Sequence, residues 1–201
     1  GGLSVPYRDG EPELDTAHYH AIWDRARREI EAHLGRKVRL EIEPGRYLVA
    51  QSGTLVAEVR AVKPVADKIF VLVNAGFNEL ARPVIYGAQH RIRFLRPDGS
   101  PVTGPSASIA LAGPLCEAGD VFTQKEEGIV EFREMPLPAV GDLAVIDDAG
   151  AYGASMSSNY NTRPLAPEVL VDNGTLTLIR ERQDLGDLFR LERSRALTPL
   201  A

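Results

Sequence analysis

Apolar and polar positions follow a helical period over residues 15–34, DTAHYHAIWDRARREIEAHL. The apolar positions fall on one stripe, and the arginines and glutamates lie elsewhere around the helix. The stripe comprises Ile22, Trp23, Ala26, Ile30 and Leu34. Asp15 or Thr16 can cap the first turn, and Gly35 suits the C-terminal stop. We therefore expect a helix over this segment.

The next segment, KVRLEIEPG over residues 37–45, alternates Val38, Leu40 and Ile42 with charged residues. This period of two predicts a strand that ends at the Pro-Gly pair. A glycine loop, a helix and a strand would together make one α/β unit, whose first strand would precede the sequence.

Short β-rich runs follow Gly45, separated by glycine, proline, asparagine and aspartate. Asp98-Gly99 and Asn173-Gly174 favour tight turns between them. Closely spaced short strands indicate a β-sandwich or a Greek-key barrel. A helical pattern returns near residues 184–195. We predict a mainly β fold, with the end of an α/β domain over residues 1–45 and a β domain over residues 46–201.

Composition narrows the possible classes of protein. The 201 residues are 44% hydrophobic and 25% charged, which is ordinary for a globular protein. A net charge of -5 gives no general attraction to nucleic acid or to an anionic membrane, so we expect neither partner. The single cysteine excludes an intrachain disulfide and fits a reducing cytoplasm. The first residues, GGLSVPYRDGE, read like the continuation of a longer chain.

Two glycine-containing stretches could bind an anion. Glu43, Gly45 and Arg46 stand at the end of the predicted strand, where α/β folds bind ligands, and an arginine can hold a carboxylate or a phosphate. A plain strand end followed by a turn explains the same residues. Gly1-Gly2 ahead of the helix could likewise cradle a phosphate or form only a turn.

Arg82, Tyr86 and His90 recur at a spacing of four, so a helical turn would place them on one face. A surface turn with an extended arginine is the alternative. We expect His90 to be structural, and the four histidines show no metal-ligand spacing with carboxylates, so we predict no metal site.

Two further segments allow both a structural and a functional interpretation. Cys116 and Glu117 lie in GPLCEAGD, where the flanking glycine and proline suggest a shaped loop, although a lone cysteine is often a small buried hydrophobe. Tyr152 and Tyr160 lie among Gly, Ser and Asn over residues 148–164, a composition that suits a binding loop better than a core.

Five stretches, in this order and spacing, resemble the pyridoxal-phosphate-dependent diaminopimelate decarboxylases. This family belongs to the fold-type III decarboxylases, together with ornithine and arginine decarboxylases. The stretches are GGL at 1–3, EPGR at 43–46, NAGFNELARPVIYGAQH at 74–90, GPLCEAGD at 113–120 and GAYGASMSSNYNTRP at 150–164. They extend over nearly the whole chain.

The resemblance implies an N-terminal (β/α)8 barrel that carries the Schiff-base lysine, followed by a C-terminal β domain. Residues 1–45 would then be the last part of a truncated barrel, without that lysine, and the 201 residues alone would be inactive. It also implies pyridoxal 5'-phosphate as cofactor, an amino acid as substrate, and a cytoplasmic homodimer with active sites shared across the interface.

The resemblance also assigns roles to individual residues. The phosphate end of the cofactor site would be built by Gly1, Gly2, Glu43, Gly45 and Arg46. Arg46 would also face the substrate carboxylate, Arg82 and Tyr86 would hold its distal end, and Tyr152 would approach both cofactor and substrate. Cys116 and Glu117 would reach into the active site of the other subunit, with Asp120 supporting their loop.

The implied chemistry is consistent with these residue types. A distal amino-acid group carries a carboxylate and an ammonium, so Arg82 and Glu117 together match diaminopimelate better than ornithine. A thiol at Cys116 could protonate the carbon that loses CO2. Two alternatives stay open: another fold-type III decarboxylase, acting on a polyamine precursor or a carrier-linked glutamyl substrate, and a β binding module without catalysis.

Overall fold

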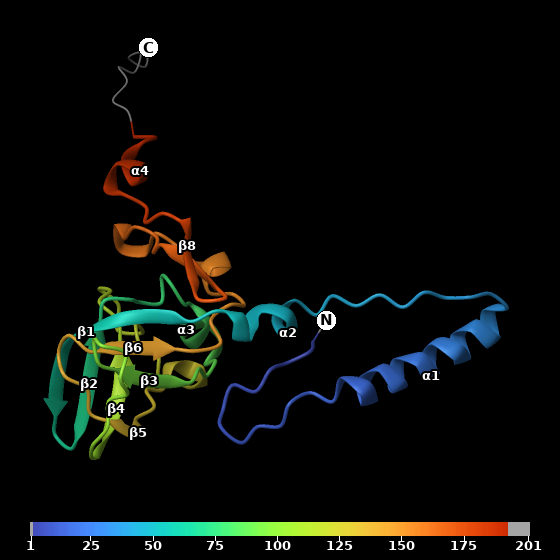
Figure 1. Cartoon of the computed structure of the whole chain (residues 1–201), viewed down its shortest axis with the longest axis horizontal. Coiled ribbons are helices and arrows are strands. Elements are labelled where there is room, and N and C mark those ends of the chain that lie inside the picture. The colour runs from blue at the N-terminus through green and yellow to red at the C-terminus, as the bar shows by residue number, and fades with distance from the viewer. Residues whose placement is uncertain (1, 193–201) are drawn as a thin grey trace, which may run out of the picture.

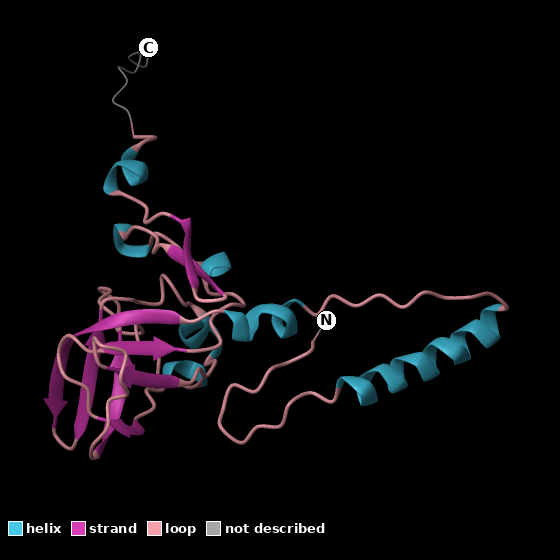
Figure 2. Cartoon of the chain, viewed as in Figure 1, coloured by secondary structure: helices cyan, strands magenta, loops and turns pink. Residues whose placement is uncertain are grey.

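A six-stranded sheet forms the main folded body of the molecule (Figure 2). The structure is a computed structural model and describes residues 2–192. Its strands are β1 (Leu55–Val65), β2 (Lys68–Val73), β3 (Ile92–Leu95), β4 (Ser106–Ala112), β5 (Arg133–Pro136) and β6 (Leu143–Ile146). They are ordered β3-β6-β1-β2-β4-β5, and the sheet curls toward a barrel. The prediction of a mainly β fold is confirmed.

The long strand β1 connects the two halves of the sheet. Its first part pairs with β6, with Leu55 opposite Ile146, and its second part pairs with β2, with Val65 opposite Lys68. The register shifts between Val59 and Ala61, and such a bulge bends a strand and increases its twist. The strand can therefore serve both halves while the sheet curls around one apolar core. That core comprises Ala57, Val59, Val71, Val73, Ala75, Leu80, Phe94, Ile109, Leu111, Phe122, Met135, Ala144 and Ile146.

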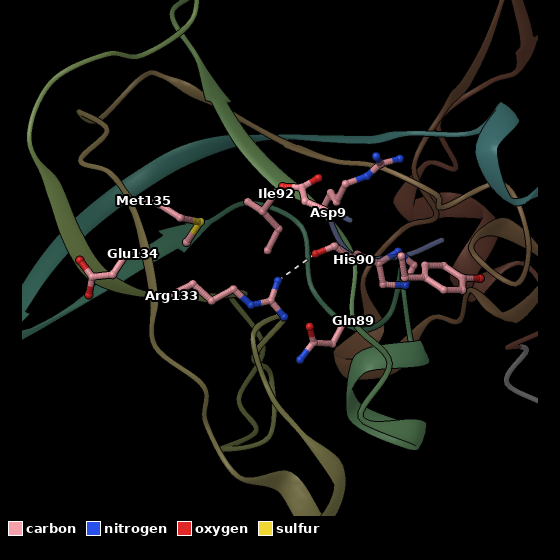
Figure 3. A pocket seen from close by; sticks show the side chains of 9 residues that line it. Asp9, Gln89, His90, Ile92, Arg133, Glu134 and Met135 are labelled. Carbon is pink, nitrogen blue, oxygen red and sulfur yellow. Dashed lines mark hydrogen bonds between the residues drawn. The ribbon is translucent and has the colours of Figure 1, made fainter. Parts of the chain in front are cut away.

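Polar groups bridge the two edges of the curled sheet, β3 and β5. The guanidinium of Arg133, at the start of β5, donates from Nη1 to the backbone oxygen of His90 at 2.8 Å (Figure 3). Its Nε donates to Oε2 of Glu131 at 2.9 Å, and Gln89 Nε2 donates to the same oxygen at 3.0 Å. A small cleft between the edges is lined by these residues. Arg133 thus fixes the backbone just before β3.

Two 3-10 turns and a hairpin complete the C-terminal half. The turns are η3 (Ala154–Met156) and η4 (Tyr160–Thr162), and the hairpin pairs β7 (Glu168–Asp172) with β8 (Thr175–Arg180). Asn173 and Gly174 connect its strands with positive φ angles of 46° and 78°, as their sequence predicts. The short helix α4 (Leu185–Phe189) covers part of the predicted closing helix, and residues 193–195 lie outside the described residues.

The predicted N-terminal helix forms as α1 (Thr16–Leu34), on an arm that extends away from the sheet (Figure 1). Asp15 caps it by accepting a bond from the His18 N–H at 2.9 Å, and Gly35 ends it with a φ of 64°. The helix has no buried residue, so its apolar stripe is uncovered. None of the helices formed by residues 2–192 is both long enough and apolar enough to cross a bilayer.

The strand predicted over residues 37–45 is wrong for this structure. Residues 37–44 have no regular secondary structure, and residue 45 begins the short helix α2 (Gly45–Val49), which continues into η1 (Ala50–Ser52). The alternating pattern is present, but a strand needs a neighbouring strand to satisfy its backbone groups, and none of the described strands pairs with this segment. The helix α3 (Arg82–Tyr86) and the turn η2 (Glu126–Gly128) are the remaining elements.

Two glycines allow the backbone after α2 to lie against the loop after β6. The Ala149 N–H donates to the Gly53 oxygen at 2.8 Å, and the Gly150 N–H donates to the Ala50 oxygen at 3.0 Å. A Cβ on Gly150 would lie 1.9 Å from the backbone oxygen of Val49, and a Cβ on Gly53 would lie 2.5 Å from Gly150 Cα. Only glycine fits this contact, which places α2 beside the segment that carries Tyr152.

Gly150→Ala should therefore destabilise the fold by about 3 kcal/mol, because backbone atoms must move to admit the methyl group. Gly45→Ala is the matched control, since a Cβ there meets nothing within 4 Å, and it should change stability by less than about 0.5 kcal/mol. Urea unfolding of the 201-residue chain followed by circular dichroism gives both values. Equal midpoints for the two variants would contradict the steric explanation.

His90 should make the fold sensitive to acid. Burial lowers the pKa of its imidazole from 6.5 to about 4. The hydrogen bond to the Asp147 backbone acts to raise this pKa, whereas the positive charges of Arg82 and Arg133 lower it further. Below pH 6.5 the unfolded chain binds a proton here that the folded chain does not. The free energy of unfolding should therefore fall by about 3 kcal/mol as the pH decreases from 6.5 to 4.

Urea titrations of the wild type and of His90→Gln between pH 7 and pH 4 isolate this contribution, because all other titrating groups are common to both proteins. The wild type should lose more stability than the variant across that interval. Parallel pH dependences would show that His90 is not the responsible group.

Candidate functional site

Arg82 is a buried cation in the first turn of α3. Its side chain is 5% exposed, and no carboxylate of the described residues lies within ion-pair distance of it. Instead, Nη1 lies 3.2 Å from Nε2 of His90, and its Cζ lies 4.7 Å from the centre of the Tyr7 ring. Burying an uncompensated charge is costly, so this arrangement favours an anion as its missing partner.

Tyr152 connects Arg82 with a second arginine. The Arg82 Cζ lies 5.9 Å from the centre of the Tyr152 ring, and the Cζ of Arg46 lies 5.8 Å from the same ring. Tyr152 has a φ of 64°, an uncommon conformation for a bulky residue that can mark a functional constraint. The structure thus brings together three of the predicted site residues, from α2, α3 and the loop after β6. Two cations near the same aromatic ring can bind anionic groups.

Tyr86 lies one turn after Arg82 but ends the helix. It is 59% exposed, and Gly87 follows in a left-handed conformation with a φ of 57°. The predicted helical face therefore does not continue to His90. The His90 ring reaches Arg82 from the chain before β3, so their contact arises from the tertiary fold and not from helical spacing.

The predicted glycine residues of the cofactor site are open to solvent. Gly2 is exposed with a φ of 88°, and Glu43 and Gly45 are exposed around the start of α2. A Cβ on Gly2 or Gly45 would meet nothing within 4 Å. Gly1 lies outside the described residues.

Asp120 organises the loop that carries Cys116 and Glu117. Its Oδ1 accepts a bond from the Phe77 N–H and its Oδ2 accepts one from the Leu115 N–H, both at 2.8 Å, as expected for a residue that supports the loop. Burial raises the pKa of the Asp120 carboxyl, and the two N–H donors act in the opposite direction. Asp120 therefore ties the start of this loop, at Leu115, to the chain that follows β2.

The exposed ends of this loop point outward from that anchor. The Cys116 N–H donates to Oδ1 of Asn161 at 2.7 Å, which leaves the thiol exposed. Glu117 is also exposed, and its Oε2 lies 3.5 Å from the Tyr160 hydroxyl. Tyr160 packs on Phe77 with ring centres 4.8 Å apart. A nucleophilic or acidic thiol and a carboxylate are thus presented side by side on a supported loop.

The two groups of candidate residues are not joined to each other. Across residues 2–192, neither Cys116 nor Glu117 shares a hydrogen bond or ion pair with Arg46, Arg82 or Tyr152. The same residues include no cluster of three or more His, Cys, Asp or Glu side chains that could hold a metal ion. The arginines and Tyr152 therefore lack a nearby thiol and carboxylate, and the loop with Cys116 and Glu117 lacks a nearby cation from that group.

The sequence did not predict three features of these groups: Tyr7, Asn161 and the contact of His90 with Arg82. Tyr7 is separated from Arg82 by a long stretch of chain and lies in an N-terminal segment of ordinary composition. Asn161 has a φ of 55°, which asparagine tolerates better than most residues, so its place in an Asn-rich stretch was an available signal.

Arg46, Arg82 and Tyr152 form what we call the cation group. Its hydrogen-bond donors suit the phosphate of pyridoxal phosphate. Arg46 has no ion-pair partner within the described part of the chain, and the space around the adjacent Gly45 is open. A phosphate needs such cationic and N–H donors, and the Tyr152 ring offers an aromatic surface beside them.

Comparison with known proteins agrees with the observed fold. Residues 18–150 match the model of the pyridoxal-dependent decarboxylase family, C-terminal sheet domain. The chain is 58% identical over 201 residues to the diaminopimelate decarboxylase of Streptomyces coelicolor, covering 99% of this chain but 46% of that protein. The chain therefore spans about half the length of this curated relative.

Solved structures show the same relationship. A crystal structure of diaminopimelate decarboxylase superposes with a TM-score of 0.90 at 57% identity, covering 95% of this chain and 46% of that one. The Helicobacter pylori diaminopimelate decarboxylase complexed with L-lysine gives a TM-score of 0.75 at 34% identity, covering 95% and 43%. The chain belongs to the pyridoxal-dependent decarboxylase family and comprises its C-terminal sheet domain.

Proposed function

We propose that this chain is the C-terminal part of a diaminopimelate decarboxylase, which converts meso-2,6-diaminopimelate to L-lysine and CO2 with pyridoxal 5'-phosphate. The observation that carries the proposal is the buried Arg82, which lacks a carboxylate partner among residues 2–192. A substrate with a second carboxylate supplies that partner. The 58% identity to a diaminopimelate decarboxylase supports the same substrate class.

The distal end of diaminopimelate carries an ammonium as well as a carboxylate. Arg82 binds the carboxylate, with Tyr86 on the next turn beside it, and Glu117 binds the ammonium. Arg46, which also lies near the Tyr152 ring, faces the carboxylate near the reacting carbon and the cofactor. A diamine precursor such as ornithine has no distal carboxylate and would leave Arg82 uncompensated.

Gly1, Gly2, Glu43, Gly45, Arg46 and Tyr152 would hold the cofactor together with residues of an upstream barrel. When bound, pyridoxal phosphate withdraws electrons from the carbon that loses CO2. Arg46 balances the negative charge of this region, and Tyr152 covers it from the side of the β domain. Cys116 then donates the Sγ proton to the carbon, after which the thiolate regains a proton from solvent.

The protein acts as a cytoplasmic homodimer in this proposal. Cys116 and Glu117 are exposed on their supported loop and do not bond to the Arg82 group of their own chain, so they serve the site of the other subunit. Residues 1–45 belong to the end of a (β/α)8 barrel, and the uncovered apolar stripe of α1 supports this assignment. Residues 46–201 form the β domain.

The test uses the longer polypeptide that joins this chain to the proposed barrel. It should release CO2 from meso-diaminopimelate and discriminate strongly against L-ornithine and L-lysine. Arg82→Met should lower kcat/KM for diaminopimelate by about 10², because it removes the cation that pairs with the distal carboxylate of the substrate. Arg60→Met, an exposed arginine on β1 paired with Glu58, is the matched control and should have no effect. A wild type inactive on diaminopimelate would refute the proposal.

Cys116→Ala should lower kcat by about 10² while the absorbance of the bound cofactor is retained, as for the loss of a general acid. An unchanged kcat would remove the assigned role. The thiol is exposed and its side chain supports no described contact, so the substitution should leave the unfolding midpoint unchanged.

Mixing Cys116→Ala with Arg82→Met subunits tests where the thiol acts. If it serves the partner, each mixed dimer has one site with neither defect, and about a quarter of the sites recover in an equal mixture. If Cys116 serves its own subunit, every site carries one defect and the mixture gains no activity.

A further inference from the structure

The bonding of His90 determines which of its nitrogens carries a proton. Its Nδ1 lies 2.9 Å from the backbone oxygen of Asp147, which can only accept a hydrogen bond. Its Nε2 lies 3.2 Å from Nη1 of Arg82, which can only donate. One neutral tautomer, with the proton on Nδ1, satisfies both contacts. The protonated ring would present an N–H to the Arg82 guanidinium and lose that bond.

The His90 ring is held from several directions. Its side chain is 2% exposed, and its backbone oxygen accepts a bond from Arg133 at the edge of β5 (Figure 3). The Tyr7 ring meets it edge-on, with ring centres 5.4 Å apart, and stands over the Arg82 guanidinium as well. Because the His90 ring is held in place, its Nε2 can in turn restrict the orientation of the Arg82 guanidinium that donates to it.

We propose that His90 is a positioning residue, whose neutral Nε2 orients the Arg82 guanidinium toward the distal carboxylate of the substrate. This inference rests on the proposed function. A carboxylate at position 90 would hold Arg82 equally well but would neutralise its charge. An imidazole lone pair engages one of the five N–H donors of the guanidinium and leaves the positive charge for the substrate.

The test replaces the ring in two ways in the longer polypeptide proposed above. His90→Phe keeps an aromatic ring beside Tyr7 but removes the acceptor, so KM for diaminopimelate should rise about tenfold while kcat changes less than about threefold. His90→Gln places an amide oxygen near the position of Nε2 and should keep KM within about threefold of the wild type. A change in folding alone would not be rescued by glutamine and would not separate KM from kcat.

A second measurement needs neither substrate nor cofactor. Nitrogen-15 spectra of the 201-residue chain with labelled histidine should show His90 as the neutral tautomer protonated at Nδ1. The Arg82 Nη resonances, assigned with Arg82→Lys, should be resolved by slow rotation in the wild type and averaged in His90→Phe.

The outcomes separate the two proposals. If the wild type does not act on diaminopimelate, the proposed function falls, and the spectra alone decide whether His90 orients Arg82. If the wild type is active but His90→Phe has an unchanged KM, or the proton resides on Nε2, the positioning role is refuted and the proposed function stands.

Discussion

The arrangement of the candidate site depends on one constraint, which is the burial of the charged Arg82 guanidinium. The Arg82 side chain is 5% exposed and has no carboxylate partner among residues 2–192, which is costly, and the fold offsets this cost with neutral groups: an imidazole acceptor and two aromatic rings. These groups come from the N-terminal segment, the chain just before β3 and the loop after β6. The environment of the cation is therefore assembled from segments that only the tertiary fold brings together.

The two candidate groups are supported by separate means, and this separation has a functional consequence. The cation group depends on tertiary contacts between distant segments, including the glycine contact that places α2 beside Tyr152. The loop with Cys116 and Glu117 depends on its own anchor, Asp120, and on Asn161. A loop that is anchored within its own domain, and not by the cation group, can keep its shape when another subunit meets it.

Local patterns in the sequence predicted what local interactions determine. The helix α1, its Asp15 cap and the Asn173-Gly174 turn depend on residues close in sequence, and all are present. Asp120 supports its loop partly through the nearby Leu115 N–H, while its second bond comes from the distant Phe77. The strand over residues 37–45 failed because pairing requires a neighbour, which a pattern in one segment does not supply. The contacts of Tyr7 and His90 with Arg82 arise only on folding, so no spacing in the sequence reveals them.

In the proposed function, discrimination between substrates would follow from the same buried charge. A dicarboxylate would give Arg82 an opposite charge, whereas a diamine would bring a second positive charge toward it. The preference would thus have an attractive and a repulsive part, and both parts require that no anionic neighbour neutralises Arg82. Because its pKa is lowered, the His90 imidazole stays uncharged at neutral pH. The Arg82 guanidinium therefore keeps its full positive charge for the substrate and has no second cation at its His90 contact.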